Sequence, residues 1–133
     1  MNFISLMLFV SLSNSSNMFT RYSMDEMNSL IEHEKFNLNR KTVFYIHGWI
    51  DDYNSEGGQL ITESYIRRND HNIVIIDWGQ YSLTELIWSV LQCTKIANIL
   101  GIKLLDLFNH GLKPKLIHCV RINLFVCRMK IKF

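Results

Sequence analysis

Three short runs of apolar residues recur along the chain, at residues 43–46, 73–76 and 116–120. They contain many β-branched or aromatic residues, and only His118 interrupts them with a polar side chain. Runs that are apolar on both faces are typical of strands buried inside a parallel sheet. We therefore predict three parallel strands, with His118 as a hydrogen-bonded histidine inside the core.

Helix boundary signals stand between the first two runs. Ser55 and Glu56 favour a helix start, and Asn69 fits a left-handed cap at its end. The apolar residues between them fall at helical spacing, at Leu60, Ile61 and Tyr65. The pattern predicts a helix of about three turns.

A longer apolar pattern separates the second and third runs. Ser82, with Glu85 three residues later, forms a capping box, and apolar residues then recur at intervals of three and four up to Phe108. Gly111 fits the position that follows a helix end. The pattern predicts a long, largely buried helix, with Trp88 and Phe108 in the core.

The predicted elements alternate as strand, helix, strand, helix, strand. Right-handed crossovers turn this order into an α/β fold with a short parallel sheet and covering helices. Chemistry in such sheets collects at the carboxyl ends of the strands. Two of these ends carry distinctive residues, His-Gly-Trp at 47–49 and Asp-Trp-Gly at 77–79.

An apolar run at residues 3–12 precedes these elements and has two interpretations. Its length suits the hydrophobic region of a signal peptide, and Ser-Leu-Ser at 11–13 offers small residues for cleavage, which predicts a secreted protein. No Lys or Arg precedes the run, as a signal peptide would favour. The alternative is an internal strand at residues 3–10, whose upstream sequence is missing.

Composition and charge narrow the class of protein. A chain of 133 residues allows one domain, and 48% hydrophobic with 20% charged residues is the composition of a globular protein. The net charge of +2 is far below the clustered basic field that nucleic-acid binding needs. Through Asp106 the chain has 8 basic and 12 acidic residues, whereas the remainder has 6 basic and no acidic residues. No uncharged apolar run approaches the roughly 18 residues of a spanning helix, so we predict no transmembrane segment.

The cysteines and histidines point to no cofactor. Cys93, Cys119 and Cys127 are odd in number and match no zinc or redox spacing, so the sequence supports neither a closed disulfide framework nor a metal site. Glu-His-Glu at 32–34 lacks a second histidine at helical spacing, and a solvated loop explains it better. The disulfide status and the oligomeric state stay open.

The three strand motifs carry a family resemblance. Val-Phe-Tyr-Ile-His-Gly-Trp at 43–49, Asn-Ile-Val-Ile-Ile-Asp-Trp at 72–78 and Lys-Leu-Ile-His-Cys-Val at 115–120 resemble the pancreatic-lipase family of α/β-hydrolases. That family includes secreted triacylglycerol lipases, phospholipases A1 and non-catalytic yolk-protein relatives. The resemblance begins near Phe-Thr-Arg-Tyr at 19–22 and implies a partial α/β-hydrolase with a lipid ester as substrate or ligand.

The resemblance also implies roles for the first strand end. The turn after this strand supplies a backbone N–H to the oxyanion hole, which here is the amide of Trp49. Gly48 leaves room for a sharp turn that aims this N–H at a substrate carbonyl. His47 supports the turn through ring hydrogen bonds and transfers no proton.

The third strand end departs from the family. Where the family has the nucleophile elbow Gly-His-Ser-Leu-Gly, this chain has Arg-Ile-Asn-Leu-Phe at 121–125, so Asn123 stands at the serine position. An amide has no ionisable group to activate as a nucleophile. The triad acid and histidine follow the serine in these folds and would lie beyond Phe133. We therefore expect an inactive, truncated lipase-like chain; the alternative is a non-catalytic member that binds lipid or protein.

The resemblance divides the chain into a signal peptide at 1–13, a partial hydrolase domain at 14–120 and a basic tail at 121–133 outside the family. We favour truncation by intron read-through over divergence, because the tail is rich in residues with A- and T-rich codons. The family strand order puts the first run between the other two. The strand at 116–120 then becomes an apolar edge, which favours aggregation. The choice between triacylglycerol and phospholipid stays open.

Overall fold

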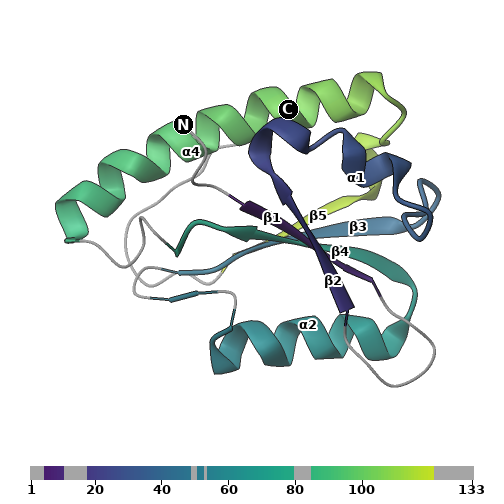
Figure 1. Cartoon of the computed structure of the whole chain (residues 1–133), viewed down its shortest axis with the longest axis horizontal. Coiled ribbons are helices and arrows are strands. Elements are labelled where there is room, and N and C mark those ends of the chain that lie inside the picture. The colour runs from purple at the N-terminus through teal and green to yellow at the C-terminus, as the bar shows by residue number, and fades with distance from the viewer. Residues whose placement is uncertain (1–4, 11–17, 49–50, 53, 80–84, 122–133) are drawn as a thin grey trace.

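A computed structural model describes residues 5–10, 18–48, 51–52, 54–79 and 85–121 (Figure 1). In chain order the elements are β1 (Ser5–Val10), β2 (Met18–Ser23), the 3-10 helix η1 (Met24–Glu26), α1 (Ser29–Glu32), β3 (Lys41–Ile46), α2 (Glu56–Arg68), β4 (His71–Asp77), α4 (Leu86–Asn109), the 3-10 helix η2 (Pro114–Leu116) and β5 (Ile117–Arg121).

The five described strands form one sheet in the order β2-β1-β4-β3-β5. β3 runs parallel to both β4 and β5, which confirms the predicted parallel strands and the central place of the first run. β1 is antiparallel to its two neighbours, β2 and β4. α2 covers one face of the sheet, while α1 and α4 lie on the other (Figure 1). The molecule is thus an α/β fold in three layers.

β1 occupies an interior position in this sheet. Ser5–Val10 pairs with β2 on one side and with β4 on the other, so it joins the antiparallel and parallel parts of the sheet. This is the arrangement that the strand alternative predicts for the apolar run. Cleavage after residue 13 would remove the strand that connects β2 to β4.

The central strands β3 and β4 are buried on both faces. Phe44 and Val74 lie opposite one another and face the side of α4, whereas Tyr45 and Ile75 pair on the side of α2, where Ile61 packs against them. Each of these large side chains contributes about 1.5–3 kcal/mol by leaving water. Burial on two faces explains why the runs carry so few polar residues.

The structure of α2 confirms the predicted boundaries. The side chain of Ser55 accepts a hydrogen bond from the Gly58 N–H at 3.1 Å, which caps the first turn. Asn69 adopts the left-handed conformation at the other end, with φ of 52°. Both ends are therefore set by residues adjacent to the helix.

α4 departs from its prediction at its start. The helix begins at Leu86, so Glu85 precedes it instead of filling the third helical position of a capping box. Ser82 lies outside the described residues. The other end is as predicted, because Gly111 follows the helix with a positive φ of 106°.

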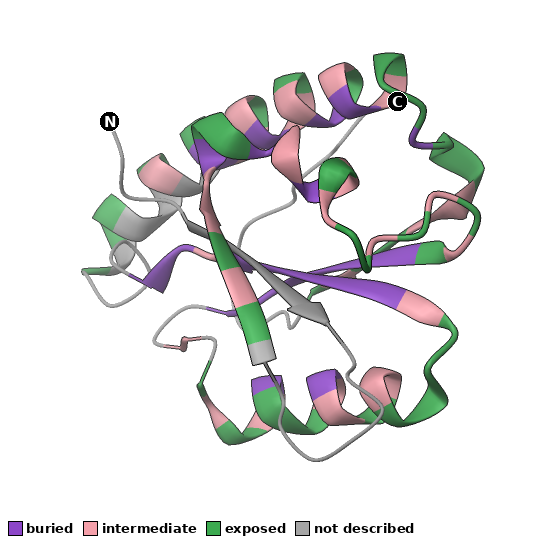
Figure 2. Cartoon of the chain, turned by 45° about the vertical axis from the view of Figure 1, so that its right-hand side comes forward, coloured by how far each residue is buried: buried purple, intermediate pink, exposed green. Residues whose placement is uncertain are grey.

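The prediction that α4 is largely buried is wrong. Only one side of the helix faces the sheet, through Ile96, Leu100, Leu104 and Leu107. Trp88, which was expected in the core, is 59% exposed, whereas Phe108 is partly buried against the core. Figure 2 shows exposed residues along the side of α4 that faces away from the sheet. A helix with a sheet on one side only buries one stripe, however apolar its other side is.

β5 also differs from its prediction in burial. The strand starts at Ile117, one residue later than expected, and His118 is exposed and not a core histidine. Among the described strands only β3 pairs with β5, so one edge and part of a face remain uncovered. Cys119 is an exposed free cysteine, and partial burial raises the pKa of its thiol.

The described residues offer neither a membrane-spanning helix nor a metal site. None of their helices is long and apolar enough to cross a membrane. They contain no group of three or more His, Cys, Asp or Glu side chains that could hold a metal ion.

Candidate functional site

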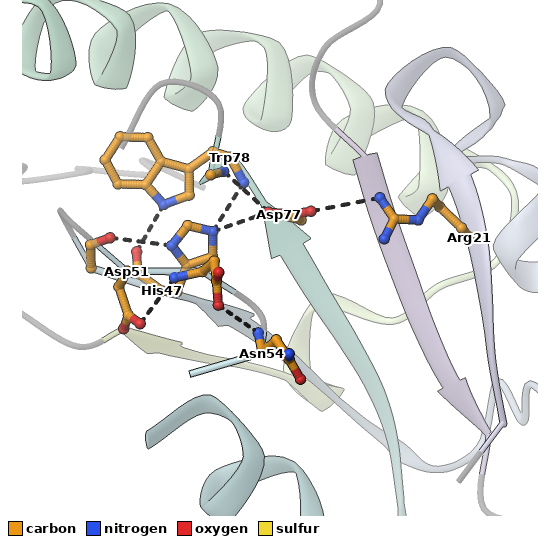
Figure 3. Close-up of polar contacts among 9 residues, drawn as sticks. Arg21, His47, Asp51, Asn54, Asp77 and Trp78 are labelled. Atoms are coloured by element: carbon orange, nitrogen blue, oxygen red, sulfur yellow. Dashed lines mark hydrogen bonds and ion pairs between the residues drawn. The ribbon is translucent and has the colours of Figure 1, made fainter. Parts of the chain in front are cut away.

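The carboxyl ends of β3 and β4 bring the two distinctive sequence motifs together. Ile46 lies opposite Ile76 in the parallel register, so the residues that follow each strand emerge side by side. His47 and Gly48 come from β3, and Asp77 and Trp78 from β4 (Figure 3). Adjacent parallel strands place their ends at one edge of a sheet, which is where α/β folds build sites.

The ring of His47 is buried and uses both nitrogens. Nε2 accepts a hydrogen bond from the Trp78 N–H at 3.1 Å, so the ring proton lies on Nδ1 and is donated to the Gly48 carbonyl at 3.1 Å. The residue is 1% exposed. Because both ring nitrogens are engaged in this way, the ring fixes the backbone of the turn.

Trp78 binds the same turn a second time. Its indole Nε1–H donates to the His47 carbonyl at 2.8 Å, and the two rings stack with centroids 5.7 Å apart and an interplanar angle of 15°. Two hydrogen bonds and a ring stack therefore connect the ends of β3 and β4. We call this arrangement of His47 and Trp78 the strand-end clamp.

Asp77 lies at the edge of the strand-end clamp. Its Oδ1 accepts from the Gly79 N–H at 3.1 Å and lies 3.3 Å from Nε2 of His47, while Oδ2 lies 3.7 Å from Nη1 of Arg21. Burial by itself raises the pKa of the Asp77 carboxyl, but the neighbouring polar groups, which include the Gly79 N–H and the Arg21 guanidinium, together lower it below its ordinary value. The carboxyl is therefore ionised at neutral pH.

Gly79 is tightly placed beside this carboxylate. A Cβ added at position 79 would stand 3.1 Å from Oδ1 of Asp77, closer than ordinary van der Waals contact. A side chain here would push the carboxylate away from its N–H donor. The glycine thus allows the close approach that the Asp77 contacts require.

Side chain to backbone hydrogen bonds shape the loop between β3 and α2. A carboxylate oxygen of Asp51 accepts from the Asp52 N–H at 2.9 Å, and Asp52 accepts from the Asn54 N–H at 2.8 Å (Figure 3). Short polar residues stabilise turns in this way. They define the path of the chain from the turn to the start of α2.

Tyr45, near the carboxyl end of β3, has a hydroxyl that makes no hydrogen bond to the described residues. The residue is fully buried, and within the described residues its hydroxyl has no hydrogen-bond partner. Burial, with a smaller contribution from Asp51, raises the pKa of Tyr45 to about 12. The hydroxyl stays neutral and offers no acid or base at physiological pH.

The residues expected from the sequence fall into two groups. His47 and Gly48 lie at the strand-end clamp, where both ring nitrogens of His47 make hydrogen bonds; their role in supporting an oxyanion turn stays a prediction. Trp49 and Asn123 lie outside the described residues, so the oxyanion donor and the nucleophile position stay predictions. Sequence reasoning missed Arg21, which reaches Asp77 from β2, because nothing in the chain pattern links the two positions.

Chemically, the strand-end clamp is a rigid support for a turn. It holds the Gly48 carbonyl and the His47 backbone in place without leaving a free acid or base among its own side chains. A fixed turn of this kind suits a site in which backbone N–H groups stabilise a developing negative charge.

Comparisons with known proteins agree on a family. A family model described as Lipase matches residues 3–123 of the chain. Lipase member H-A of Xenopus laevis is 29% identical over 98 residues, which cover 66% of this chain and 20% of that protein. Lipase member H of Danio rerio is 27% identical over 96 residues, which cover 68% of this chain and 20% of that protein. The chain spans about one fifth of the length of these relatives. The family model includes β1, which lies before the first residues of the resemblance.

Proposed function

The chain belongs to the lipase family, and on that premise we propose that it carries the oxyanion-binding turn of a lipid-ester hydrolase but lacks the nucleophile. The family reaction is hydrolysis of carboxylic esters of lipids through a serine acyl-enzyme. This chain does not turn over esters. The substitution of Asn123 for the serine is the observation that carries the proposal.

The turn after β3 is the part of the site that this chain retains. In the proposal, the amide of Trp49 donates to the oxyanion, and Gly48 leaves room for the substrate carbonyl to approach. The strand-end clamp supports this role, because both ring nitrogens of His47 and the indole of Trp78 hold the turn rigid. One such preorganised donor lowers the barrier of acyl transfer by roughly 3 kcal/mol.

The end of β5 is where a nucleophile would have to stand. Arg121 lies opposite Ile46, so the residues after β5 start at the same edge of the sheet as the turn. A serine there attacks the ester carbonyl after losing its proton to a base, and the alcohol leaves with a proton from that base. The amide of Asn123 has no hydroxyl, and its nitrogen lone pair is delocalised into the carbonyl, so a base cannot turn it into a nucleophile. Arg121 and Phe125 also replace the glycines that let an elbow pack closely.

Hydrolysis of a short-chain chromogenic ester tests the proposal directly. The purified chain is expected to give no rate above the uncatalysed background, and no labelling by a fluorophosphonate, because both need an activated hydroxyl. An Asn123→Ala variant is the matched control and should behave identically. Turnover that a serine-directed inhibitor abolishes would contradict the proposal.

The origin of the residues after Val120 has its own test. In the proposal they replace a family segment through intron read-through. Sequencing of transcripts should then find messages that join the codon for Val120 to codons for Gly-His-Ser. If every message encodes residues 121–133 as printed, the chain is a divergent member and not a truncated one.

Location outside the cell is also part of the proposal. The resemblance to secreted lipases and the apolar run at residues 3–12 both favour export. N-terminal sequencing of protein exported by expressing cells distinguishes the two interpretations of this run. A first residue at position 14 means that the run was a signal peptide, whereas a start at or before residue 5 means that β1 is retained.

A groove on the α2 side favours a second candidate, the binding of lipid without turnover. It has a volume of about 350 Å³. Its lining consists of Leu60, Ile61, Ser64, Tyr65, Arg68 and Val120. Apolar walls with a few polar groups are typical of small-molecule sites. Binding of a fluorescent fatty acid tests this candidate. Saturable binding that is lost in Ile61→Glu and kept in Leu105→Glu would support it. Binding that does not saturate would exclude it.

A further inference from the structure

The outer face of α4 exposes many large apolar side chains. Opposite the side that packs on the sheet, five large hydrophobic residues are more than half exposed, namely Ile87 (74%), Trp88 (59%), Leu91 (54%), Ile102 (67%) and Leu105 (58%). They form two apolar groups, Ile87 with Trp88 and Leu91, and Ile102 with Leu105, and the exposed polar residues Thr94, Lys95 and Asn98 lie between them. Each group exposes on the order of 300 Å², the size of the largest apolar patch on many monomers. Figure 2 shows this side of the helix turned away from the sheet and from the other described elements.

The residues along this face fall at heptad spacing, and the order of the spacings is the same when it is read from either end of the helix. Six positions, spaced alternately four and three apart, form a seam: Ile87, Leu91, Thr94, Asn98, Gly101 and Leu105. If two copies of α4 lie antiparallel, the first position meets the last, the second meets the fifth, and the third meets the fourth. A self-complementary register of this kind is what a dimer with two-fold symmetry requires.

We propose that a second copy of this chain covers the outer face of α4 by antiparallel pairing of the two helices. Ile87 of one copy then packs against Leu105 of the other. Leu91 packs over Gly101 of the other copy, where a Cβ would meet no atom of its own chain within 4 Å, so the surface is open to receive a side chain. Trp88 and Ile102, beside the seam, extend the contact.

The centre of the seam determines the register. Thr94 and Asn98 are both exposed and meet across the two-fold axis. A polar pair at the centre favours this alignment, because a shift by one heptad separates Thr94 from Asn98 and places Asn98 against Ile87 or Gly101 instead. The apolar residues, with this pair, approach the roughly 800 Å² per partner of a standard interface.

Charge on α4 favours a protein partner over a membrane surface. The helix has three charged residues, Lys95, Lys103 and Asp106. Lys103 lies 3.9 Å from a carboxylate oxygen of Asp25, and Asp106 accepts from the Asn28 side chain at 2.6 Å. Helices that lie in a lipid surface carry many Lys and Arg side chains on their polar face, which this helix lacks.

Lys95 gives the antiparallel dimer a characteristic dependence on salt. It is exposed next to the centre of the seam, so in the antiparallel dimer it lies near Lys95 of the other copy. Two like charges in this position weaken the pair, and salt screens them. The dissociation constant of the dimer should therefore fall as the salt concentration rises. Salt screens the repulsion between the two Lys95 side chains, and it does not weaken the apolar contacts.

Sedimentation equilibrium of the purified full chain tests the surface. Over about 1–100 µM we expect a monomer–dimer equilibrium, which Leu91→Glu weakens by about 100-fold because it buries a charge at each of two sites. Leu60→Glu is the matched control, since Leu60 is 59% exposed on α2, where it lines the groove on the opposite face of the sheet from α4. Circular dichroism confirms that each variant is folded.

A charge swap tests the register without touching the apolar residues. Tagged Lys95→Glu chains are mixed with untagged, unaltered chains, and the heterodimers are captured through the tag. In low salt we expect about 5- to 10-fold more heterodimer than random pairing gives, because the introduced carboxylate then faces Lys95 of the other chain. This excess should vanish near 1 M salt. Three results would overturn the proposal. They are a monomer at every concentration, dissociation by Leu60→Glu but not by Leu91→Glu, and a chain that stays monomeric but binds phosphatidylcholine vesicles through Leu91.

Discussion

At the ends of β3 and β4, His47 and Trp78 are at most 5% exposed and satisfy each other's polar atoms, whereas Trp88 on α4 is 59% exposed. Both regions are rich in large side chains, and one residue type, tryptophan, occurs in each. The difference lies in what surrounds them. β4 has a strand on either side and helices above and below, while the outer face of α4 has none of the described elements against it.

The two regions depend on different parts of the protein. The strand-end clamp is complete within the described residues, because its hydrogen bonds and its ring stack join neighbouring strands. The outer face of α4 and the free edge of β5 depend on what lies beyond them. Substitutions in the first region should change the stability of the single chain, and those in the second should change its association.

Adjacent leucines on α4 give the largest expected contrast. Leu104 is 1% exposed and Leu105 is 58% exposed. Leu104→Ala should lower the free energy of unfolding by about 2–5 kcal/mol, because it leaves a cavity in the core. Leu105→Ala should change it by no more than about 0.5 kcal/mol. Urea unfolding near 1 µM, where the proposed dimer is dissociated, measures both; equal effects would mean that α4 does not pack as described.

The two tryptophans provide the next contrast. Trp78→Phe keeps a ring but removes the Nε1–H, which leaves the buried His47 carbonyl without its donor and costs about 1–3 kcal/mol. Trp88→Phe should cost less than about 0.5 kcal/mol in the monomer. Denaturant unfolding of both variants provides the measurement. A Trp78→Phe chain as stable as the unaltered one would contradict the strand-end clamp.

Acid stability isolates Asp77. Its pKa is lowered in the folded chain, so its stabilising contribution is fully present above the unfolded aspartate pKa of about 3.9 and is lost as pH falls through the lower folded value. Asp77→Asn should therefore flatten the fall in the free energy of unfolding below about pH 4, as measured by urea titrations at several pH values.

Asp70 serves as the control for this titration. Arg68 and His71 lower the pKa of this exposed carboxyl to about 2. Salt near 1 M should remove most of the contribution of Asp70, because this carboxylate and its partner Arg68 are both exposed, but should leave most of the contribution of the half-buried Asp77. If both vanish together, the Asp77 contacts are as exposed as those of Asp70.

Tyr45→Phe should have the smallest effect. The hydroxyl of Tyr45 is buried and has no partner among the described residues, so its removal deletes an unsatisfied polar group and keeps the ring. We expect a change between zero and a gain of about 1 kcal/mol in the free energy of unfolding. A loss of stability would show that the hydroxyl binds a group outside the described residues.

Local signals in the sequence determined a substantial part of the fold. Ser55 and Asn69 predicted both ends of α2, and Gly111 predicted the end of α4, because caps act on residues one to four positions away. The apolar runs at 43–46 and 73–76 predicted β3 and β4 for a similar reason, since burial on both faces removes the need for polar residues.

Only the tertiary structure decided which apolar residues are buried and which distant residues meet. Periodicity placed Trp88 and His118 in apolar segments, but their exposure depends on whether another element lies against them. Arg21 reaches Asp77 only because β1 enters the sheet between β2 and β4. Capping and periodicity act over a few residues of chain, whereas burial and ion pairing depend on neighbours that the sequence separates by dozens of residues.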